Sequence, residues 1–200
     1  MELSALSNIY REAGIVGAGG AGFPTYAKLN SNAETILLNC AECEPLLRLH
    51  RQLLKFHASE IISAFEETRK TVGAKEGIVC IKEHYKGAIE AVTALLPEYP
   101  SMKIKILPKV YPAGDEVMLI YDATGKVVRP GGLPIECGVA VFNVETMYNA
   151  YCALNGESLT SKLVTIAGEV KDPKTLRLPL GAKLSEVVKL AGGETIDDFV

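Results

Sequence analysis

Short apolar segments alternate with longer amphipathic segments through most of this chain of 200 residues. Short apolar segments are typical of buried strands, and apolar residues repeated at three- and four-residue steps are typical of helices. The predicted strands are 35–40, 77–81, 103–107 and 139–143, and the predicted helices are 4–13, 46–72, 85–96, 114–125 and 145–154. This order predicts an α/β sandwich with a largely parallel sheet.

The pattern changes after Gly156. Residues 163–170 and 174–179 are predicted to form a hairpin, and residues 184–190 a short helix. The order of two strands and a helix predicts a small ubiquitin-like module, so we expect one domain at 1–156 and a second at 157–200. The sequence ends without closing an obvious element, so we expect it to be part of a longer protein.

The overall composition argues against several classes of protein. The net charge of −3 argues against a nucleic-acid-binding surface. No apolar run approaches the roughly 18 residues that a membrane span needs. The N-terminus lacks the basic and apolar regions of a signal peptide, so we expect a cytoplasmic protein, with the option that it lies peripheral to a membrane complex.

Five cysteines are scattered through the chain, which predicts free thiols rather than a disulfide framework. Cys40 and Cys43 have the spacing of a metal-binding pair, but there is no second pair, and we expect no metal site here. Glu42 stands between them and would raise the pKa of both thiols, which argues against a redox dithiol.

The segment from residue 17 to residue 25 carries four glycines within six residues: Gly17, Gly19, Gly20 and Gly22. Backbone of this kind can approach a ligand closely and present N–H groups to a phosphate. A short helix is expected to follow from Thr25. The sequence therefore predicts a phosphate-binding loop, with a purely structural glycine turn as the alternative.

Gly17, Gly19 and Gly22 also match the dinucleotide-binding fingerprint, and Glu42 lies twenty residues beyond Gly22, where a ribose-binding acid would be expected. Two features count against a Rossmann unit. The segment before the glycines is helical, and residues 22–35 leave room for about two turns, which is short for a crossover helix. A non-Rossmann phosphate loop is favoured on these grounds.

Five short segments together resemble a known superfamily. They are 17–25 followed by Lys28, 39–45, 111–116, 132–134 and 143–146. Their order and spacing are similar to the NADH-binding FMN subunit of respiratory complex I and to the C subunit of the Rnf electron-transport complex. Among Rnf C-like flavoproteins the chain looks closest to the cobalamin reductase and proline-reductase-associated groups. Residues 163–193 resemble the soluble-ligand-binding β-grasp domain of the same family.

The resemblance implies a Rossmann-like but non-Rossmann flavin-binding fold and a set of FMN contacts. The glycine loop would hold the phosphate, Lys28 would lie near the isoalloxazine, and Asn39 would hydrogen-bond the flavin. The full set of cofactor residues that it implies is Gly17, Gly19, Gly20, Gly22, Lys28, Asn39, Glu42, Tyr111, Gly114, Asp115, Glu116, Asn143 and Thr146.

The same resemblance implies a second site for NADH. Phe23 would stack near the nicotinamide nucleotide, and Glu44 would lie beside it. Together with Glu42 and Glu116, Glu44 would disfavour the additional phosphate of NADPH by charge repulsion.

Several of these residues also have a plainer interpretation. Lys28 and the acids are solvated charges in that reading, and Phe23 packs in the core. Asn143 or Thr146 then caps the following helix.

The activity implied is transfer of hydride from NADH to FMN, followed by transfer of electrons to iron–sulfur clusters. No CxxCxxC run occurs in these residues, so the clusters and the partner subunits would lie outside them. Phe142 replaces an asparagine that the family often has, and one flavin contact is expected to be lost. The alternatives are a docking domain that keeps the fold without flavin, and a Rossmann dehydrogenase.

Overall fold

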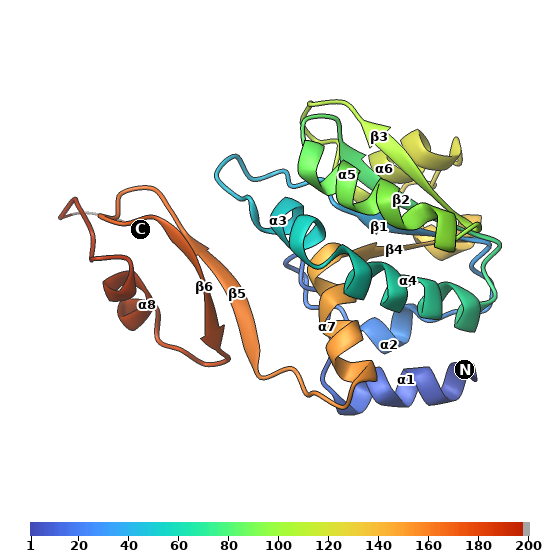
Figure 1. The fold of residues 1–200 in the computed structure, drawn as a ribbon, viewed down its shortest axis with the longest axis horizontal. Helices are drawn as coiled ribbons and strands as arrows, with labels where there is room; N and C mark the ends of the chain where they lie inside the picture. The colour runs from blue at the N-terminus through green and yellow to red at the C-terminus, as the bar shows by residue number, and fades with distance from the viewer. Residues whose placement is uncertain (198–200) are drawn as a thin grey trace.

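The structure, a computed structural model, describes residues 1–197 and shows a larger α/β unit followed by a small hairpin module (Figure 1). The last three residues of the module predicted at 157–200 lie outside the described part. The strands are β1 (Thr35–Asn39), β2 (Glu76–Lys82), β3 (Met102–Leu107), β4 (Val139–Asn143), β5 (Ser161–Ile166) and β6 (Lys174–Pro179). The helices are α1 (Leu3–Glu12), α2 (Thr25–Lys28), α3 (Leu49–Phe56), α4 (Ala58–Val72), α5 (Lys86–Leu95), α6 (Glu116–Thr124), α7 (Val144–Leu154) and α8 (Leu184–Leu190).

The larger unit is built on a four-stranded parallel sheet in the order β3-β2-β1-β4. Strand β1 is an inner strand, paired with β2 on one side and with β4 on the other, and helices pack on both of its faces. That position explains why β1 is a continuous apolar run rather than an alternating one. The predicted parallel α/β sandwich is confirmed.

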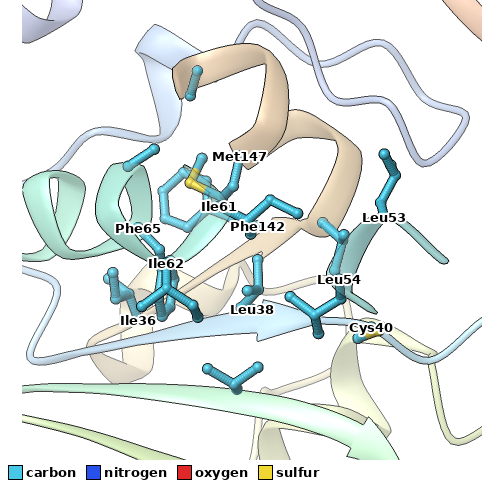
Figure 2. Packing of buried hydrophobic residues seen from close by; sticks show 14 of the residues in the cluster. Ile36, Leu38, Cys40, Leu53, Leu54, Ile61, Ile62, Phe65, Phe142 and Met147 are labelled. Carbon is cyan, nitrogen blue, oxygen red and sulfur yellow. The ribbon is translucent and has the colours of Figure 1, made fainter. Parts of the chain in front are cut away.

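Alternate side chains of β1 enter two different cores. Ile36 and Leu38 pack with residues of α4 and α7, and Figure 2 shows them beside Ile62 and Phe142. Leu37 instead belongs to a smaller cluster on the opposite face, where α6 covers the sheet. The parallel strands therefore run between two helical layers, and their carboxyl ends meet at one edge of the sheet.

The predicted single helix over residues 46–72 is wrong in one respect, because two helices occupy this stretch. Helix α3 ends at Phe56 and α4 begins at Ala58, and His57 between them leaves the helical conformation with φ −128° and ψ 32°. The His57 side chain contacts Glu60 in the first turn of α4 (Nδ1 to Oε1, 3.1 Å). The apolar period continues across the break, so periodicity could not reveal it.

The glycine loop is not preceded by a strand. Val16 and Pro24 form an isolated antiparallel bridge that closes the base of the loop. Helix α2 is a single turn of four residues, too short to serve as the crossover of a βαβ unit. The expectation of a fold that is not a Rossmann unit is confirmed, and the Rossmann alternative is wrong.

The small module has the predicted order of hairpin and helix. Strands β5 and β6 are antiparallel, and α8 packs on them through Val187, with Ala191 directly after its last turn. The first strand ends at Ile166 rather than at Val170, which forms only an isolated bridge with Glu194. Within residues 1–197, no helix is both long enough and apolar enough to cross a membrane.

Candidate functional site

A cavity of about 420 Å³ opens at the carboxyl ends of β1 and β4. Its walls come from the glycine loop, α2, the loop after β1, the first turn of α3 and the first turns of α6 and α7. Twelve of the fifteen predicted site residues line it: Gly17, Gly19, Gly22, Phe23, Lys28, Asn39, Glu42, Glu44, Gly114, Glu116, Asn143 and Thr146. Residues from six separate segments therefore converge on one cavity.

The glycine loop is tied down at its base and at one further point. The Gly17 amide donates to Phe23 O (2.7 Å), and the Ala18 amide donates to the Thr146 hydroxyl (2.9 Å). Gly20 and Gly22 adopt φ of +126° and +62°, which other residues rarely tolerate. A side chain on Gly19 would project toward Asn143, with its Cβ 3.4 Å from Nδ2. Bare backbone thus forms this wall, as close approach of a phosphate group requires.

Lys28 provides the positive charge of the cavity wall beside the sheet. Its ammonium donates to Val141 O (3.1 Å) and lies 3.4 Å from a Glu116 carboxylate oxygen. It also lies 5.8 Å from the centre of the Phe23 ring. These contacts hold the ammonium at the wall, in place of the freely solvated lysine of the plainer interpretation.

Asn39 joins two loops that form the floor of the cavity. Its Nδ2 donates to Gly114 O (2.9 Å), and its Oδ1 accepts from the Ala41 amide (2.9 Å). One N–H and one acceptor lone pair of the side-chain amide remain for a ligand. Gly114 must be a glycine here, because a Cβ would lie 2.2 Å from Ala41 O.

Asn143 and Thr146 lie at the beginning of α7. Asn143 caps this helix by accepting from the Glu145 amide (2.9 Å), as the plainer interpretation expected. Its Nδ2 lies 3.3 Å from His50 Nε2. Thr146 does not cap the helix, and its hydroxyl instead accepts from Ala18 in the glycine loop.

The three acids in the cavity wall have different surroundings. Glu42 is buried, and its carboxylate accepts from the His50 amide (2.9 Å) and from Arg51 Nε (3.1 Å), so it is not a solvated loop charge. Glu116 is paired with Lys28, whereas Glu44 is exposed. Only Glu44 therefore presents a negative charge without a partner inside the described part of the chain.

Three predicted residues do not reach the cavity wall. Gly20 belongs to the glycine loop but is not part of the wall. Tyr111 is 81% exposed. Asp115 caps α6 by accepting from the Val117 and Met118 amides (3.0 and 3.1 Å). Tyr111 and Asp115 thus lie outside the cavity wall, and their assignment to the cofactor stays a prediction.

Eight residues of the wall are not among the predicted site residues: Ala21, Thr25, Ala41, Cys43, Leu47, His50, Val141 and Phe142. Burial lowers the pKa of His50, and the carboxylates of Glu42 and Glu145 oppose that shift. A histidine eight residues after Glu42 carried no signal in the sequence, because the place where α3 begins was not foreseen. Phe142, where the family resemblance implied an asparagine, is buried in the helical core.

Metal-binding side chains do not gather in the described residues, where no group of three or more His, Cys, Asp or Glu could hold an ion. Cys40 is fully buried, and this burial raises its pKa well above the usual value, with Glu42 adding to the shift. Cys43 lies nearby with partial exposure. A buried, protonated Cys40 is a core residue rather than half of a reactive pair.

Two known protein families match the chain, one in each of its parts. Residues 10–152 match the Nuo51 FMN-binding domain, and residues 163–198 match the SLBB domain. The chain is 46% identical over 189 residues to cobalamin reductase PduS of Citrobacter freundii, an alignment that covers 94% of this chain and 42% of that protein. It is 32% identical over 199 residues to the C subunit of the Na⁺-translocating ferredoxin:NAD⁺ oxidoreductase complex of Acetobacterium woodii, with 96% and 45% covered.

A solved structure supports the fold. The structure of an NAD⁺-reducing [NiFe]-hydrogenase in its H₂-reduced state superposes with a TM-score of 0.81 at 24% identity, covering 97% of this chain and 40% of that one. The chain therefore spans less than half the length of these relatives.

Proposed function

Since this chain belongs to the family of the Nuo51 FMN-binding domain, we propose that it is an electron-transfer flavoprotein module that receives hydride from NADH. FMN, when bound, supplies a ring that takes up a hydride and releases electrons singly. The acceptors would be iron–sulfur clusters and partner subunits outside the described residues. A cytoplasmic place, peripheral to a membrane complex, belongs to the same proposal.

One observation carries this proposal. The glycine loop, Lys28, Asn39 and the start of α7 come from distant parts of the chain and line a single cavity at the carboxyl ends of parallel strands. Ligands of open α/β sheets bind at this edge. The bare backbone at Gly19 leaves space that a Cβ would fill, so the residues present fit a phosphorylated flavin.

The chain's own residues would bind and orient two planar molecules. The glycine loop would donate backbone N–H groups to the FMN phosphate, and Asn39 would bond the ring with the hydrogen and lone pair that its loop contacts leave. Lys28 would place a positive charge near the ring and favour its reduced form. Phe23, which is half exposed at the mouth, would contact the nicotinamide nucleotide, and Glu44 would disfavour NADPH.

An anaerobic titration tests the proposal. The purified chain is reconstituted with FMN and titrated with NADH and, separately, with NADPH while flavin absorbance is followed. We expect bleaching of the flavin band by NADH and a much weaker response to NADPH. FMN that binds but is not bleached by NADH would leave the flavin site intact and remove the NADH half of the proposal.

Phe142 favours a second candidate, a docking domain that has kept the fold without flavin. Its ring is 2% exposed and belongs to the helical core, so no amide is available at this point of the cavity wall. A chain that stays colourless and does not quench FMN fluorescence at micromolar concentrations would establish this candidate over the first.

A further inference from the structure

Thr25 is the feature of the cavity that the contacts within the chain do not explain. It is the first residue of α2, it lines the cavity, and it is 1% exposed. Its hydroxyl is the one buried side-chain nitrogen or oxygen without a hydrogen-bond partner in the part of the chain that the structure describes. Native proteins pair almost all buried hydroxyls, so this atom calls for an explanation.

Other threonines of the chain show what a paired hydroxyl looks like. Thr68 and Thr124 each donate to the carbonyl four residues earlier in their helix (2.8 and 2.7 Å). Thr68 also bonds the hydroxyl of Tyr10 (2.9 Å). Thr25 cannot bond in this way because it opens its helix, and the residues before it belong to the glycine loop.

The position of Thr25 is fixed independently of any ligand. Its amide donates to the carbonyl of Ile15 (3.0 Å), and Ile15 is itself buried. The base of the glycine loop closes immediately before it through the bridge between Val16 and Pro24. A β-branched side chain on a fixed backbone has few rotamers, so the hydroxyl is held in place before a ligand arrives.

Resting on the proposed function, we infer that Thr25 is a further cofactor-binding residue whose hydroxyl donates a hydrogen bond to an oxygen atom of the bound flavin nucleotide. FMN carries acceptor oxygens on its phosphate, ribityl chain and ring carbonyls, and a hydroxyl can always donate to one of them. The partner missing within the protein is then supplied by the cofactor. An unpaired buried hydroxyl lowers the stability of the free protein and raises the gain on binding.

Two opposite effects of one substitution test this inference. Thr25→Val keeps the shape of the side chain and removes the hydroxyl. We expect the Kd for FMN, measured by fluorescence quenching, to rise about five- to tenfold. We expect the Tm of the protein without FMN to rise by about 2 °C, because a buried unpaired hydroxyl is gone.

Two further variants serve as controls. Thr25→Ser keeps the hydroxyl and loses a methyl group, so FMN affinity should stay within about twofold while the Tm falls. Thr68→Val removes an equally buried but paired hydroxyl outside the cavity, so the Tm should fall with FMN affinity unchanged.

The outcomes separate this inference from the proposed function. Equal FMN affinity of wild type and Thr25→Val would overturn the inference alone, as would a Thr25→Val variant with a lowered Tm. Failure of the wild type to bind FMN would overturn the proposed function and the inference with it. Titration of the same variants with riboflavin and with lumiflavin assigns the oxygen, because the Thr25→Val effect disappears with the ligand that lacks the partner atom.

Discussion

Two loops that line the cavity, the loop after β1 and the glycine loop, are built in different ways. The loop after β1 is held by side chains: Asn39 bonds both its own loop and Gly114, Glu42 accepts from Arg51, and the Lys82 ammonium donates to Glu42 O (2.8 Å). The glycine loop is held at its base, and within the described residues its one side-chain hydrogen bond is the one from the Ala18 amide to Thr146.

The difference indicates that one loop contributes mainly to stability and the other mainly to ligand binding. The loop after β1 is a preformed wall that its own hydrogen bonds hold in place without a ligand, with one N–H and one lone pair of Asn39 left over. The glycine loop and the beginning of α2 keep free N–H groups and one unpaired hydroxyl, which a ligand completes. Substitutions in the first wall should therefore lower stability, and substitutions around the second should alter binding.

The largest effect is expected from Gly114→Ala, which introduces a Cβ 2.2 Å from a backbone oxygen of the preformed wall. Since backbone must shift, we expect a loss of about 3 kcal/mol in the free energy of unfolding, measured by urea denaturation. Gly19→Ala is the matched control in the other loop, with a Cβ at 3.4 Å from a side chain, and should cost less than about 1 kcal/mol. Equal losses of stability in Gly114→Ala and Gly19→Ala would contradict the difference between the two loops.

Glu42→Gln should have the next largest effect. It removes the buried charge that Arg51 and the His50 amide contact, and we expect a loss of about 2 kcal/mol in stability. Glu44→Gln, two residues along the same loop but exposed, should change stability by less than about 0.5 kcal/mol. A Glu42→Gln protein as stable as Glu44→Gln would show that the buried pair does not hold this wall.

Lys28→Met tests the role of α2, next to the glycine loop, in ligand binding. In the FMN-loaded protein we expect the midpoint potential to become more negative by about 20 mV, since an interaction of about 1 kcal/mol with the reduced ring is lost. Lys126→Met is the control, because Lys126 likewise donates to a carboxylate and to a backbone carbonyl but lies outside the cavity wall. A potential that does not move in Lys28→Met would remove the assigned role.

The smallest effect concerns pH. Burial lowers the pKa of His50 in the folded chain, so as pH falls below about 6.5 the unfolded chain binds a proton first and stability decreases. The carboxylates of Glu42 and Glu145 face His50 and oppose this shift, whereas the ammonium of Lys162 adds to it. We expect the free energy of unfolding to be lower at pH 5.5 than at pH 7.5, and His50→Gln to remove part of that difference. An identical pH dependence of stability in His50→Gln and the wild type would show that His50 does not contribute to it.

The sequence predicted the elements well where one physical signal dominates. Strand β1 is a run of apolar residues because both of its faces are covered, and the helix over 46–72 was read from a period that continues across His57. The period reports which residues are buried and not where the backbone changes direction. The break therefore stayed hidden, and with it the place of His50 in the cavity.

The candidate site, too, was predicted from the sequence in part. Motifs located most of the cavity wall, because glycines and amides at fixed spacing are visible in one dimension. The same motifs included Tyr111 and Asp115, which the structure turns to solvent and to the cap of α6. Thr25 ends the first motif but was not among the predicted site residues, because its lack of a partner is a property of its surroundings and not of its residue type.

The sequence alone thus determined the alternation of strands and helices, the glycine loop and the family to which these belong. The tertiary structure decided which polar groups pair with one another and which remain for a ligand. The physical reason is that secondary structure follows from local periodicity, whereas hydrogen-bond pairing depends on atoms brought together from distant segments. Thr146 and Ala18 are 128 residues apart in the chain and 2.9 Å apart in the fold.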